Sequence, residues 1–408
     1  MKNNVYDTLL ERDFVAQVTH EQEVRNYLSQ EGATFYEGFD PTADSLHAGH
    51  LVQIMVMGHM LRAGLRPIAL MGGGTGYIGD PSGRTDMRTV MTPETIEYNV
   101  NCFIEQMKNL LDFSADKMIL ANNAEWLVPV GYLDFIREVG PHFTINRMLS
   151  AECYKQRLET GLSFLEFNYM MLQAYDFLML FRKHGCRLQV GGDDQWSNII
   201  AGTELIRKKE QEPAFGLTFK LLETSGGQKM GKTAKGALWL DESKCSVYDF
   251  YQYWRNIDDA DVSQNLRFMT FLEMNEIREY DKLEGADINQ AKKRLAYEVT
   301  ALVHGHAKAK QAEEAALSLF ESGGDDASVP SEMIAPHELG STLIDILAGH
   351  GLMQSKGAAR RLIEQGGLYV GDEAVTELFT ELTENLFTNN ELIIRLGKKR
   401  YIKLIIEN

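Results

Sequence analysis

Short apolar runs that end in glycines alternate with longer helical patterns through the first half of this 408-residue chain. Residues 67–71 and 186–190 are predicted strands, whereas residues 51–61 and 164–181 have the spacing of amphipathic helices. This alternation is typical of a parallel α/β sheet. Because ligands bind at the carboxyl ends of the strands in such sheets, we look for functional side chains where glycines follow an apolar run.

Two histidines, His47 and His50, stand three positions apart where a helix is predicted to begin. With the backbone N–H groups of a helix N-terminus, they predict a site for an anion such as phosphate. Gly49 between them lets a ligand approach the backbone closely. The alternative is a capped helix in which both histidines are incidental.

A glycine-rich segment, 72–83, follows the predicted strand at 67–71 and contains the pattern GxGxxG from Gly74 to Gly79. A dinucleotide-binding fingerprint should open a helix, but the sequence DPSG at 80–83 favours a turn. A P-loop does not fit either, since no GK[ST] follows. We therefore predict a broad loop whose backbone meets a small ligand, and a plain wide turn is the alternative.

Three polar residues, Tyr169, Gln173 and Asp176, lie on one face of the predicted helix at 164–181, because their spacing is i, i+4 and i+7. The rest of that helix is largely apolar, and buried polar groups need hydrogen-bond partners. These side chains either satisfy one another and their neighbours or line a polar ligand pocket. A stripe that faces solvent is the alternative.

Two further segments combine glycines with charged side chains. GGDD at 191–194 follows the predicted strand at 186–190, and its carboxylates suit ribose hydroxyls or a metal ion; a βα turn with an Asp cap is the alternative. KMGKT at 229–233 carries Lys229 and Lys232 on a glycine-flanked loop. A mobile cationic loop of this kind can close over phosphates and stabilise charge in a transition state. A solvated surface loop is the alternative.

The second half of the chain differs in its pattern. Residues 247–320 are predicted to be helical, residues 321–340 form a linker that begins ESGGDD, and the last residues, from 341 to 408, form a small separate α/β unit. The formal net charge of the chain is −17, yet basic residues of this last unit cluster at 356–361 and 395–403. These clusters predict a local basic surface that binds RNA, and a solvated surface of mixed charge is the alternative.

The sequence disfavours several other classes of protein. The four cysteines lie far apart without a CxxC pair, which argues against a zinc ribbon, a thioredoxin-type site and a disulfide scaffold. The first residues lack the pattern of a signal peptide, and no apolar run approaches the roughly 20 residues that span a bilayer. We therefore expect a soluble, cytoplasmic protein with no membrane partner.

Taken together and in order, HAGH, GGGTGYIGDPSGR, YMMLQAYD, GGDDQW and KMGKT resemble the motifs of bacterial-type tyrosyl-tRNA synthetases, which are class I aminoacyl-tRNA synthetases. HAGH is similar to the HIGH element of that class and KMGKT to its KMSKS element, with departures at Ala48, Gly231 and Thr233. Residues 347–375 and the closing LGKKRYIKL resemble an S4 RNA-binding domain. The resemblance covers essentially the whole chain.

The resemblance implies an α/β fold with three domains and a linker. These are a Rossmann-like parallel-sheet catalytic domain at 1–246, a helical tRNA-recognition domain at 247–320, the linker at 321–340, and a small S4-like α/β RNA-binding domain at 341–408. The implied activity is tyrosine–tRNA ligation, in which ATP and tyrosine give tyrosyl-adenylate and pyrophosphate and the tyrosyl group then moves to the 3′ end of tRNA(Tyr). The implied partners are L-tyrosine, ATP with Mg²⁺, tRNA(Tyr) and a second copy of the chain in a homodimer. No metal ligated by the protein is expected.

The resemblance also implies roles for individual residues. The phenolic hydroxyl of the substrate would be bound by Tyr36 and Asp176, and its ammonium group by Tyr169, Gln173 and Asp80, with Gln195 near its carboxylate. The phosphates would be bound by Thr42, His47, His50, Lys229, Lys232 and Thr233. ATP would also be bound by Asp40, Gly49, Gly192 and Asp194, the last two at the ribose. RNA would be bound by Lys356, Arg360, Arg361, Lys398, Lys399 and Arg400.

Three rival interpretations remain open at this point. A tryptophanyl-tRNA synthetase shares the class I elements, although Tyr36 together with Asp176 favours a phenol over an indole. A small-molecule nucleotidyltransferase also uses an HxGH phosphate site, but it would not need the helical segment and the RNA-like tail. A non-catalytic RNA-binding protein on a synthetase scaffold would be expected to have lost the histidines or lysines, and none of them is lost.

Overall fold

The computed structural model describes residues 4–82, 91–111, 117–225, 227, 230–233, 236–321, 331–371, 373–388, 390–397 and 400–406. The chain divides into two compact units. The first contains Met1–Gly231, Ala237–Asp241 and Asp258–Ile288, and the second contains Lys232–Gly236, Glu242–Ile257 and Asn289–Asn408. Among the described residues, no helix is long and apolar enough to cross a membrane.

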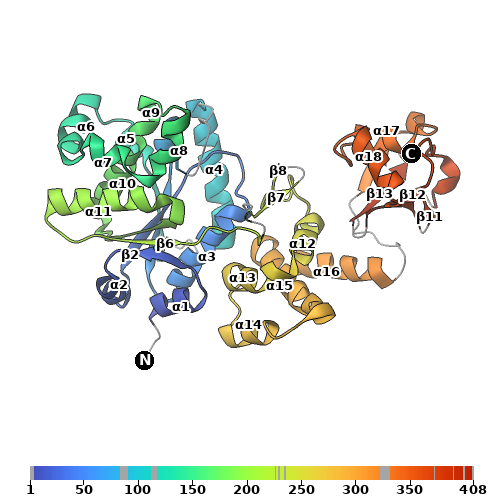
Figure 1. Ribbon diagram of the computed structural model, residues 1–408, viewed down its shortest axis with the longest axis horizontal. Coiled ribbons are helices and arrows are strands. Elements are labelled where there is room, and N and C mark those ends of the chain that lie inside the picture. The colour runs from blue at the N-terminus through green and yellow to red at the C-terminus, as the bar shows by residue number, and fades with distance from the viewer. Residues whose placement is uncertain are drawn as a thin grey trace. The chain divides into compact units, whose positions relative to one another are not determined.

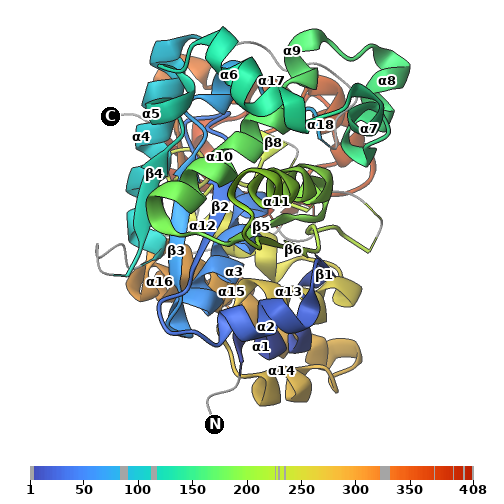
Figure 2. The ribbon, with the colours of Figure 1, turned by 90° about the vertical axis from the view of Figure 1, so that its left-hand side faces the viewer.

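The first unit is built on a six-stranded sheet with the strand order β1-β6-β5-β2-β3-β4, whose strands are labelled in Figure 2. The pairs from β6 to β4 are parallel, and only the edge strand β1 runs antiparallel, to β6. This confirms the predicted parallel α/β sheet. The strand predicted at 67–71 is β3, whereas the strand predicted at 186–190 lies two residues later, as β5. The strands are β1 (Val15–Val18), β2 (Thr34–Phe39), β3 (Arg66–Met71), β4 (Ile119–Asn122), β5 (Leu188–Gly192) and β6 (Phe215–Phe219).

The strand order reverses between β2 and β5. The chain leaves β2 toward β3 through α3 (Ala48–Arg62), and it leaves β5 toward β6 through α11 (Trp196–Glu210). Right-handed crossovers in opposite directions place their helices on opposite faces, and in sheets of this kind ligands bind at the carboxyl ends of the strands where the order reverses. HAGH ends the loop after β2 and begins α3, and GGDDQW runs from the end of β5 into α11, so the topology brings both segments to one edge of the sheet.

Helices pack over the sheet around a core that includes Tyr36 and Ile68 of the strands and Phe177 and Leu178 of α10 (Tyr169–His184). Figures 1 and 2 show α10 and α11 lying side by side. The predicted helices at 51–61 and 164–181 correspond to α3 and to the pair α9 and α10. The other helices of this unit are α1 (Val5–Glu11), α2 (Glu21–Leu28), α4 (Pro93–Leu110), α5 (Ala124–Leu127), α6 (Tyr132–Val139), α7 (Ile145–Leu149), α8 (Glu152–Thr160), α9 (Phe164–Phe167), α13 (Asp259–Met269) and α14 (Met274–Tyr280), with short 3₁₀ helices η1 (Thr75–Tyr77), η2 (Gly140–His142), η3 (Asp193–Gln195) and η4 (Gly285–Asp287).

The second unit begins with helices and ends with a small mixed domain. Its helices α12 (Val247–Arg255), α15 (Ile288–His304) and α16 (His306–Glu321) come from the segment predicted to be helical. A five-stranded sheet follows, with the order β11-β10-β12-β13-β9. Its strands are β9 (Ser331–Ile334), β10 (Leu368–Val370), β11 (Glu373–Ala374), β12 (Glu391–Leu396) and β13 (Arg400–Ile406), and its helices are α17 (Leu343–Gly349), α18 (Lys356–Glu364), η5 (Pro336–Glu338) and η6 (Glu384–Leu386).

The C-terminal sheet has a hydrophobic core of its own. Buried residues such as Leu347, Ile363, Ile394 and Leu404 form one cluster that draws only on residues 334–404. Strand β9 lies within the segment that the sequence predicts as a linker, and it pairs in parallel with β13. The ordered domain of the structure therefore begins before residue 341.

His350, which follows α17, lies between two carboxylates and so connects α17 to β9 and η5. Its Nδ1 lies 3.0 Å from Oε1 of Glu332 on β9, and its Nε2 lies 2.8 Å from Oε1 of Glu338 on η5. Hydrogen bonds to Glu332 and Glu338 raise the pKa of His350, against a smaller opposing effect of burial. Only the imidazolium can donate to both carboxylates at once.

We expect the contribution of His350 to the stability of this domain to depend on pH. Because its folded pKa is raised, the stabilisation is complete below the unfolded pKa of about 6.5 and is lost as the pH rises through the folded pKa. His350→Gln should therefore speed amide hydrogen exchange of residues 331–338 more at low pH than at high pH, after correction for intrinsic exchange. An effect of the same size at every pH would contradict the charged bridge.

Candidate active site

The two histidines of HAGH form the N-terminal cap of α3. His47 is the N-cap residue, and its Nδ1 accepts a hydrogen bond from the backbone N–H of Gly49 at 3.0 Å. The backbone N–H of His47 in turn donates to Nδ1 of His50 at 3.1 Å. The two rings lie 3.9 Å apart between centroids. The histidines therefore satisfy backbone donors that the start of a helix leaves unpaired.

These hydrogen bonds also decide which nitrogen carries the proton. Since Nδ1 of both rings accepts from a backbone N–H, a neutral ring carries its proton on Nε2. Burial lowers the pKa of His47, with a smaller opposing effect of its backbone hydrogen bond, and so favours the neutral ring. The capped helix and the anion site are thus compatible at His47, because its ring caps the helix through Nδ1 and carries a donor on Nε2.

The KMGKT segment returns to the start of α3. A Cβ atom on Gly231 would lie 2.9 Å from Cβ of Ala48, and Gly231 has a φ of +82°, which strongly favours glycine. Leu238 ties the two segments together, because its N–H donates to the carbonyl of Gly231 and its carbonyl accepts from the N–H of Ala48. The departures from the HIGH and KMSKS consensus at 48 and 231 are therefore neighbouring small residues. Lys229 lies outside the described residues, and Lys232 and Thr233 are described only by their backbone, as β7 (Lys232–Thr233), which pairs with β8 (Gly236–Ala237).

Helix α10 carries a buried carboxylate, that of Asp176. Asp176 is 2 % exposed, and its Oδ1 accepts from Nε1 of Trp126 at 2.7 Å while its Oδ2 accepts from Nδ2 of Asn123 at 2.9 Å. Tyr36 of β2 is 1 % exposed, and its hydroxyl has no hydrogen-bond partner among the residues that the structure describes. A buried hydroxyl without a partner costs free energy unless a ligand or water satisfies it.

Burial controls the ionisation of this pair. It raises the pKa of Asp176 to about 7, although the hydrogen bonds from Asn123 and Trp126 act in the opposite direction. Burial and the nearby Asp176 carboxylate also raise the pKa of Tyr36, so its hydroxyl stays protonated. A carboxylate with two fixed donors beside an unpaired hydroxyl is suited to bind one further hydroxyl group.

A second polar cluster joins the loops after β2 and β3. The Oδ2 of Asp40 accepts from the hydroxyl of Tyr169 at 3.1 Å, and its Oδ1 accepts from the hydroxyl of Thr75 at 3.1 Å. Thr75 belongs to η1, so the segment 72–82 forms a loop with one short 3₁₀ turn and does not open an α-helix. This agrees with the rejection of the dinucleotide fingerprint.

A third cluster joins that loop to GGDDQW. The Oδ2 of Asp80 accepts from Nε2 of Gln195 at 2.7 Å, and Oε1 of Gln195 accepts from Nδ2 of Asn198 at 3.1 Å. Asn198 also donates to the hydroxyl of Ser82. Gln195 is therefore fixed from two sides, by the loop after β3 and by α11.

The remaining predicted site residues line the same edge. Thr42 is exposed, Gly49 is exposed at the start of α3, and Gln173 is half-buried on α10 between Tyr169 and Asp176. At the end of β5, a Cβ atom on Gly192 would lie 2.9 Å from Oδ1 of Asp194, so glycine lets this carboxylate fold back over the strand end. Among the described residues, no group of three or more His, Cys, Asp or Glu could hold a metal ion.

The predicted RNA-binding residues lie in the C-terminal domain. Lys356, Arg360 and Arg361 belong to the exposed part of α18, and Nζ of Lys356 pairs with Oδ1 of Asp345 at 2.6 Å. Arg400 begins β13 and is described only by its backbone. Lys398 and Lys399 lie outside the described residues.

Sequence reasoning missed Asn123 and Trp126, the two donors to Asp176. Both follow β4, so they stand at the carboxyl end of a parallel strand. That position is the signal that could have found them. The strand itself has only four residues, which gives a weak pattern.

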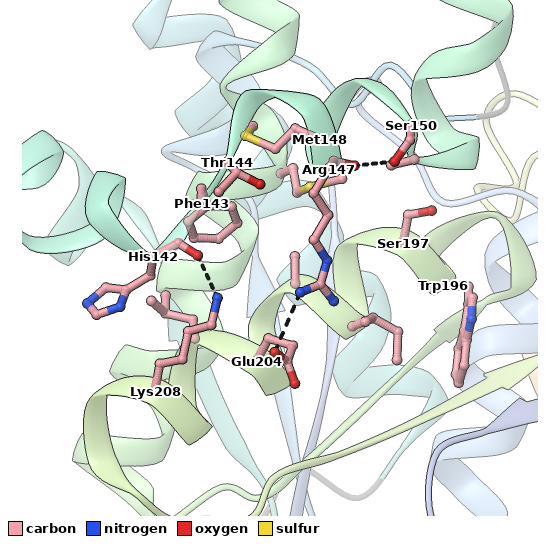
Figure 3. Close-up of a pocket in the computed structure, with 15 residues that line it drawn as sticks. His142, Phe143, Thr144, Arg147, Met148, Ser150, Trp196, Ser197, Glu204 and Lys208 are labelled. Carbon is pink, nitrogen blue, oxygen red and sulfur yellow. Dashed lines mark hydrogen bonds and ion pairs between the residues drawn. The ribbon is translucent and has the colours of Figure 1, made fainter.

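A separate cavity of about 370 Å³ lies between η2, α7 and α11 (Figure 3). Arg147 points across it to Glu204, 3.6 Å away, and Lys208 donates to the carbonyl of His142 at 2.8 Å. None of the predicted site residues lines this cavity. Because these charged side chains pair with groups of the cavity wall, we assign no ligand to it.

Comparison with known proteins identifies the family. Residues 28–321 match the family model of class I tRNA synthetases (W and Y), and residues 324–404 match that of the tyrosine--tRNA ligase SYY-like C-terminal domain. A tyrosine--tRNA ligase of Clostridium tetani is 56% identical over 407 residues, with 100% of both chains covered, and one of Clostridium botulinum (strain Loch Maree) is 56% identical over 99% of this chain and 100% of its own. The chain belongs to the tyrosyl-tRNA synthetase family. The tryptophanyl and non-synthetase interpretations are thereby excluded.

Solved structures agree with the assignment of this chain to the tyrosyl-tRNA synthetase family. A C-terminally truncated mitochondrial tyrosyl-tRNA synthetase of Aspergillus nidulans matches with a TM-score of 0.70 and 28% identity, over 78% of this chain and 95% of that one. A tryptophanyl-tRNA synthetase of Encephalitozoon cuniculi matches with a TM-score of 0.57 and 12% identity, over 75% of this chain and 87% of that one, which shows a shared fold only.

Proposed function

We propose that this synthetase activates L-tyrosine with ATP, releasing pyrophosphate, and then transfers the tyrosyl group to the 3′ end of tRNA(Tyr). The observation that carries the proposal is the buried pair of Asp176 and Tyr36. Asn123 and Trp126 hold the carboxylate in place, and within the described part of the chain the hydroxyl of Tyr36 has no hydrogen-bond partner. A phenol between these two groups would donate to Asp176 and accept from Tyr36.

This arrangement accounts for selection of tyrosine over phenylalanine. Phenylalanine in the same pocket would leave both polar groups buried without a ligand, and such loss of pairing is strongly unfavourable. Tyrosyl-tRNA synthetases are the standard example of this kind of rejection. Tyr169, Gln173 and Asp80 would bind the substrate's ammonium group, and Gln195 would lie near its carboxylate.

The start of α3 would bind the phosphates of ATP. Its N-terminal end favours negative charge, and His47 and His50 would bind the phosphates together with the backbone N–H groups. Thr42, Gly49, Lys229, Lys232 and Thr233 would complete this phosphate site, which is supported by the contact between Gly231 and Ala48. Asp40, Gly192 and Asp194 would bind the rest of ATP, the last two at its ribose.

Chemistry at this site would need alignment and charge stabilisation rather than a covalent intermediate. The tyrosine carboxylate attacks the α-phosphorus and pyrophosphate leaves, so one P–O bond forms as another breaks. The protein holds the reactants in line and places donors around the phosphoryl oxygens. Mg²⁺ would enter with ATP, held by its phosphates, and neutralise part of their charge.

The proposal assigns tRNA binding partly to the C-terminal domain, and a truncation tests this. A chain ending at residue 321, after α16, keeps the whole first unit and loses the domain with its separate core. We expect it to exchange pyrophosphate into ATP with tyrosine at a rate near that of the full chain, but to charge tRNA(Tyr) poorly. Equal charging by both chains would exclude the RNA-binding role of Lys356, Arg360, Arg361, Lys398, Lys399 and Arg400.

Homodimerisation is also a proposal, supported by apolar side chains exposed on α6, α7 and α9. Leu133 is 74 %, Ile145 is 66 % and Phe164 is 70 % exposed, and such residues on one part of a surface mark an interaction site. A second copy of the chain is the occupant we propose. Light scattering should give twice the chain mass of 46.1 kDa, and a value of one chain mass would contradict the dimer. A cytoplasmic location stays a prediction from the sequence.

A further inference from the structure

A short segment that follows KMGKT, residues 238–240, is bonded to the start of α3, and we call it the bridging segment. The backbone N–H of Ala48 donates to the carbonyl of Leu238 at 2.9 Å, and the backbone N–H of Leu240 donates to the carbonyl of Leu46 at 2.9 Å. Both bonds join backbone atoms only. A change of side chain in the bridging segment therefore leaves their donors and acceptors in place.

The bridge pairs the backbone of His47 with that of Trp239 in antiparallel fashion. The two hydrogen bonds lie on either side of this pair and not within it, and side chains of such a pair lie close together on one face. The two rings accordingly meet edge to face, 6.1 Å apart between centroids and with an interplanar angle of 63°. The bridging segment thus brings the half-buried Trp239 against the imidazole of His47.

The ring of His47 is held both from within α3 and from the bridging segment. Within α3, its Nδ1 accepts from the N–H of Gly49, and the ring of His50 lies 3.9 Å away. Trp239 adds a contact from outside the helix. Because the hydrogen bond to Nδ1 fixes only one atom of the ring, the direction of Nε2 depends also on the rings that pack against it.

The bridging segment also closes the chain that carries the second phosphate motif. The N–H of Leu238 donates to the carbonyl of Gly231 at 2.6 Å, so the residues between them form a loop whose two ends are bonded together. Lys232 is the first residue of that loop. The same short segment is therefore bonded to HAGH and to KMGKT, the two motifs that we propose to bind the phosphates of ATP.

We propose that Trp239 is a positioning residue for adenylate formation, which acts by packing against the ring of His47 and directing its Nε2 donor to the phosphates of ATP. The inference rests on the proposed function, because it uses His47 as a phosphate ligand. It gives a role to a side chain that lies outside both motifs. Tyrosine is proposed to bind at Asp176 and Tyr36, on other elements, so its KM should not depend on Trp239.

Trp239→Leu tests the proposal, because it removes the aromatic ring and keeps both an apolar side chain and the backbone bridge. In pyrophosphate exchange by the full chain, kcat should fall roughly tenfold, because a misplaced donor keeps only part of its effect. The KM for tyrosine should stay within about twofold of the wild-type value. Trp239→Phe supplies another aromatic ring and should recover most of the rate.

A double variant separates this role from a general loss of packing. His47→Asn keeps a cap on α3 but removes the imidazole, so adding Trp239→Leu to it should cause little further loss of kcat. A loss of the same size with and without the imidazole would overturn the inference, because Trp239 would then act independently of His47. A wild-type kcat in Trp239→Leu would overturn it as well.

Phe181→Leu is the matched control, since it also exchanges a half-buried aromatic residue for leucine, at the C-terminal end of α10 where the ring contacts Arg187. Its kcat should equal that of the wild type, and a fall as large as that of Trp239→Leu would overturn the role of Trp239. The proposed function fails separately. A wild-type rate in His47→Ala would exclude His47 from the phosphate site, whereas a slow His47→Ala beside an unaffected Trp239→Leu would overturn only the role of Trp239.

Discussion

Replacing Asp176 with asparagine should reduce kcat/KM for tyrosine by roughly a thousandfold, equivalent to about 4 kcal/mol. The carboxylate accepts from Trp126 and Asn123 with different oxygens, so an asparagine would direct its own NH₂ group at one of these donors. The buried site would then lose a charged acceptor and keep an unsatisfied donor. Pyrophosphate exchange measured against tyrosine concentration gives this value directly.

Two tyrosine-to-phenylalanine variants distinguish loss of hydroxyl recognition from a general disturbance of the surrounding core. Tyr36→Phe removes the hydroxyl that has no partner in the structure, and it should lower the preference for tyrosine over phenylalanine. Tyr175→Phe changes a neighbouring residue of α10 that packs against Phe135, and it should leave that preference unchanged. An unaltered preference in both Asp176→Asn and Tyr36→Phe would rule out the assignment of the phenol pocket.

The ionisation of Asp176 gives the same pocket a pH dependence. Burial raises its pKa to about 7 in the free protein, and the ionised form is the one that accepts from a phenol. The value of kcat/KM for tyrosine should therefore fall as the pH drops below about 7, approaching tenfold per pH unit. Asp176→Asn should lack this limb of the profile. A plateau that continues down to about pH 5 would contradict the raised pKa.

Replacing His47 with alanine should slow tyrosyl-adenylate formation by roughly a hundredfold at saturating tyrosine. The change removes two features at once, namely the cap of α3 through Nδ1 and the donor at Nε2. Loss of a cap alone costs about 1 kcal/mol of stability. The two contributions must therefore be separated by variants that keep one of them.

Asparagine and glutamine at position 47 provide that separation. The Oδ1 of asparagine can accept from the N–H of Gly49 and restore the cap, but asparagine has no group at the position of Nε2. Glutamine places an NH₂ group near that position. We expect His47→Asn to recover stability without recovering the rate of adenylate formation, and His47→Gln to recover part of the rate. A wild-type rate in His47→Asn would show that the ring serves only as a cap.

Features that depend on residues close together in the chain could be predicted from the sequence. The glycines after β3 and at the end of β5, and the spacing of Tyr169, Gln173 and Asp176, are local patterns in the sequence. They indicate the edge of the sheet where we propose the site. The GxGxxG pattern at 74–79 forms only a short 3₁₀ turn, as the turn residues DPSG after it predict.

Contacts between distant segments were beyond the sequence. Asn123 and Trp126 meet Asp176 only because β4 lies beside β3 under α10, and Gln17 meets Asp193 only because β1 closes the edge of the sheet next to β6. Periodicity does not encode such pairings. The sequence pattern of HAGH does not show whether its histidines cap a helix or bind an anion. The geometry of His47 permits both.

We propose that Asp176 and Tyr36 bind the phenolic hydroxyl of the amino acid during adenylate formation. ATP–pyrophosphate exchange by the purified full chain, with each of the twenty amino acids supplied separately, tests it most directly. We predict exchange with tyrosine and none above background with phenylalanine or tryptophan. Exchange with phenylalanine at a rate comparable to that with tyrosine would contradict the claim, because it would show that the pocket does not depend on the hydroxyl.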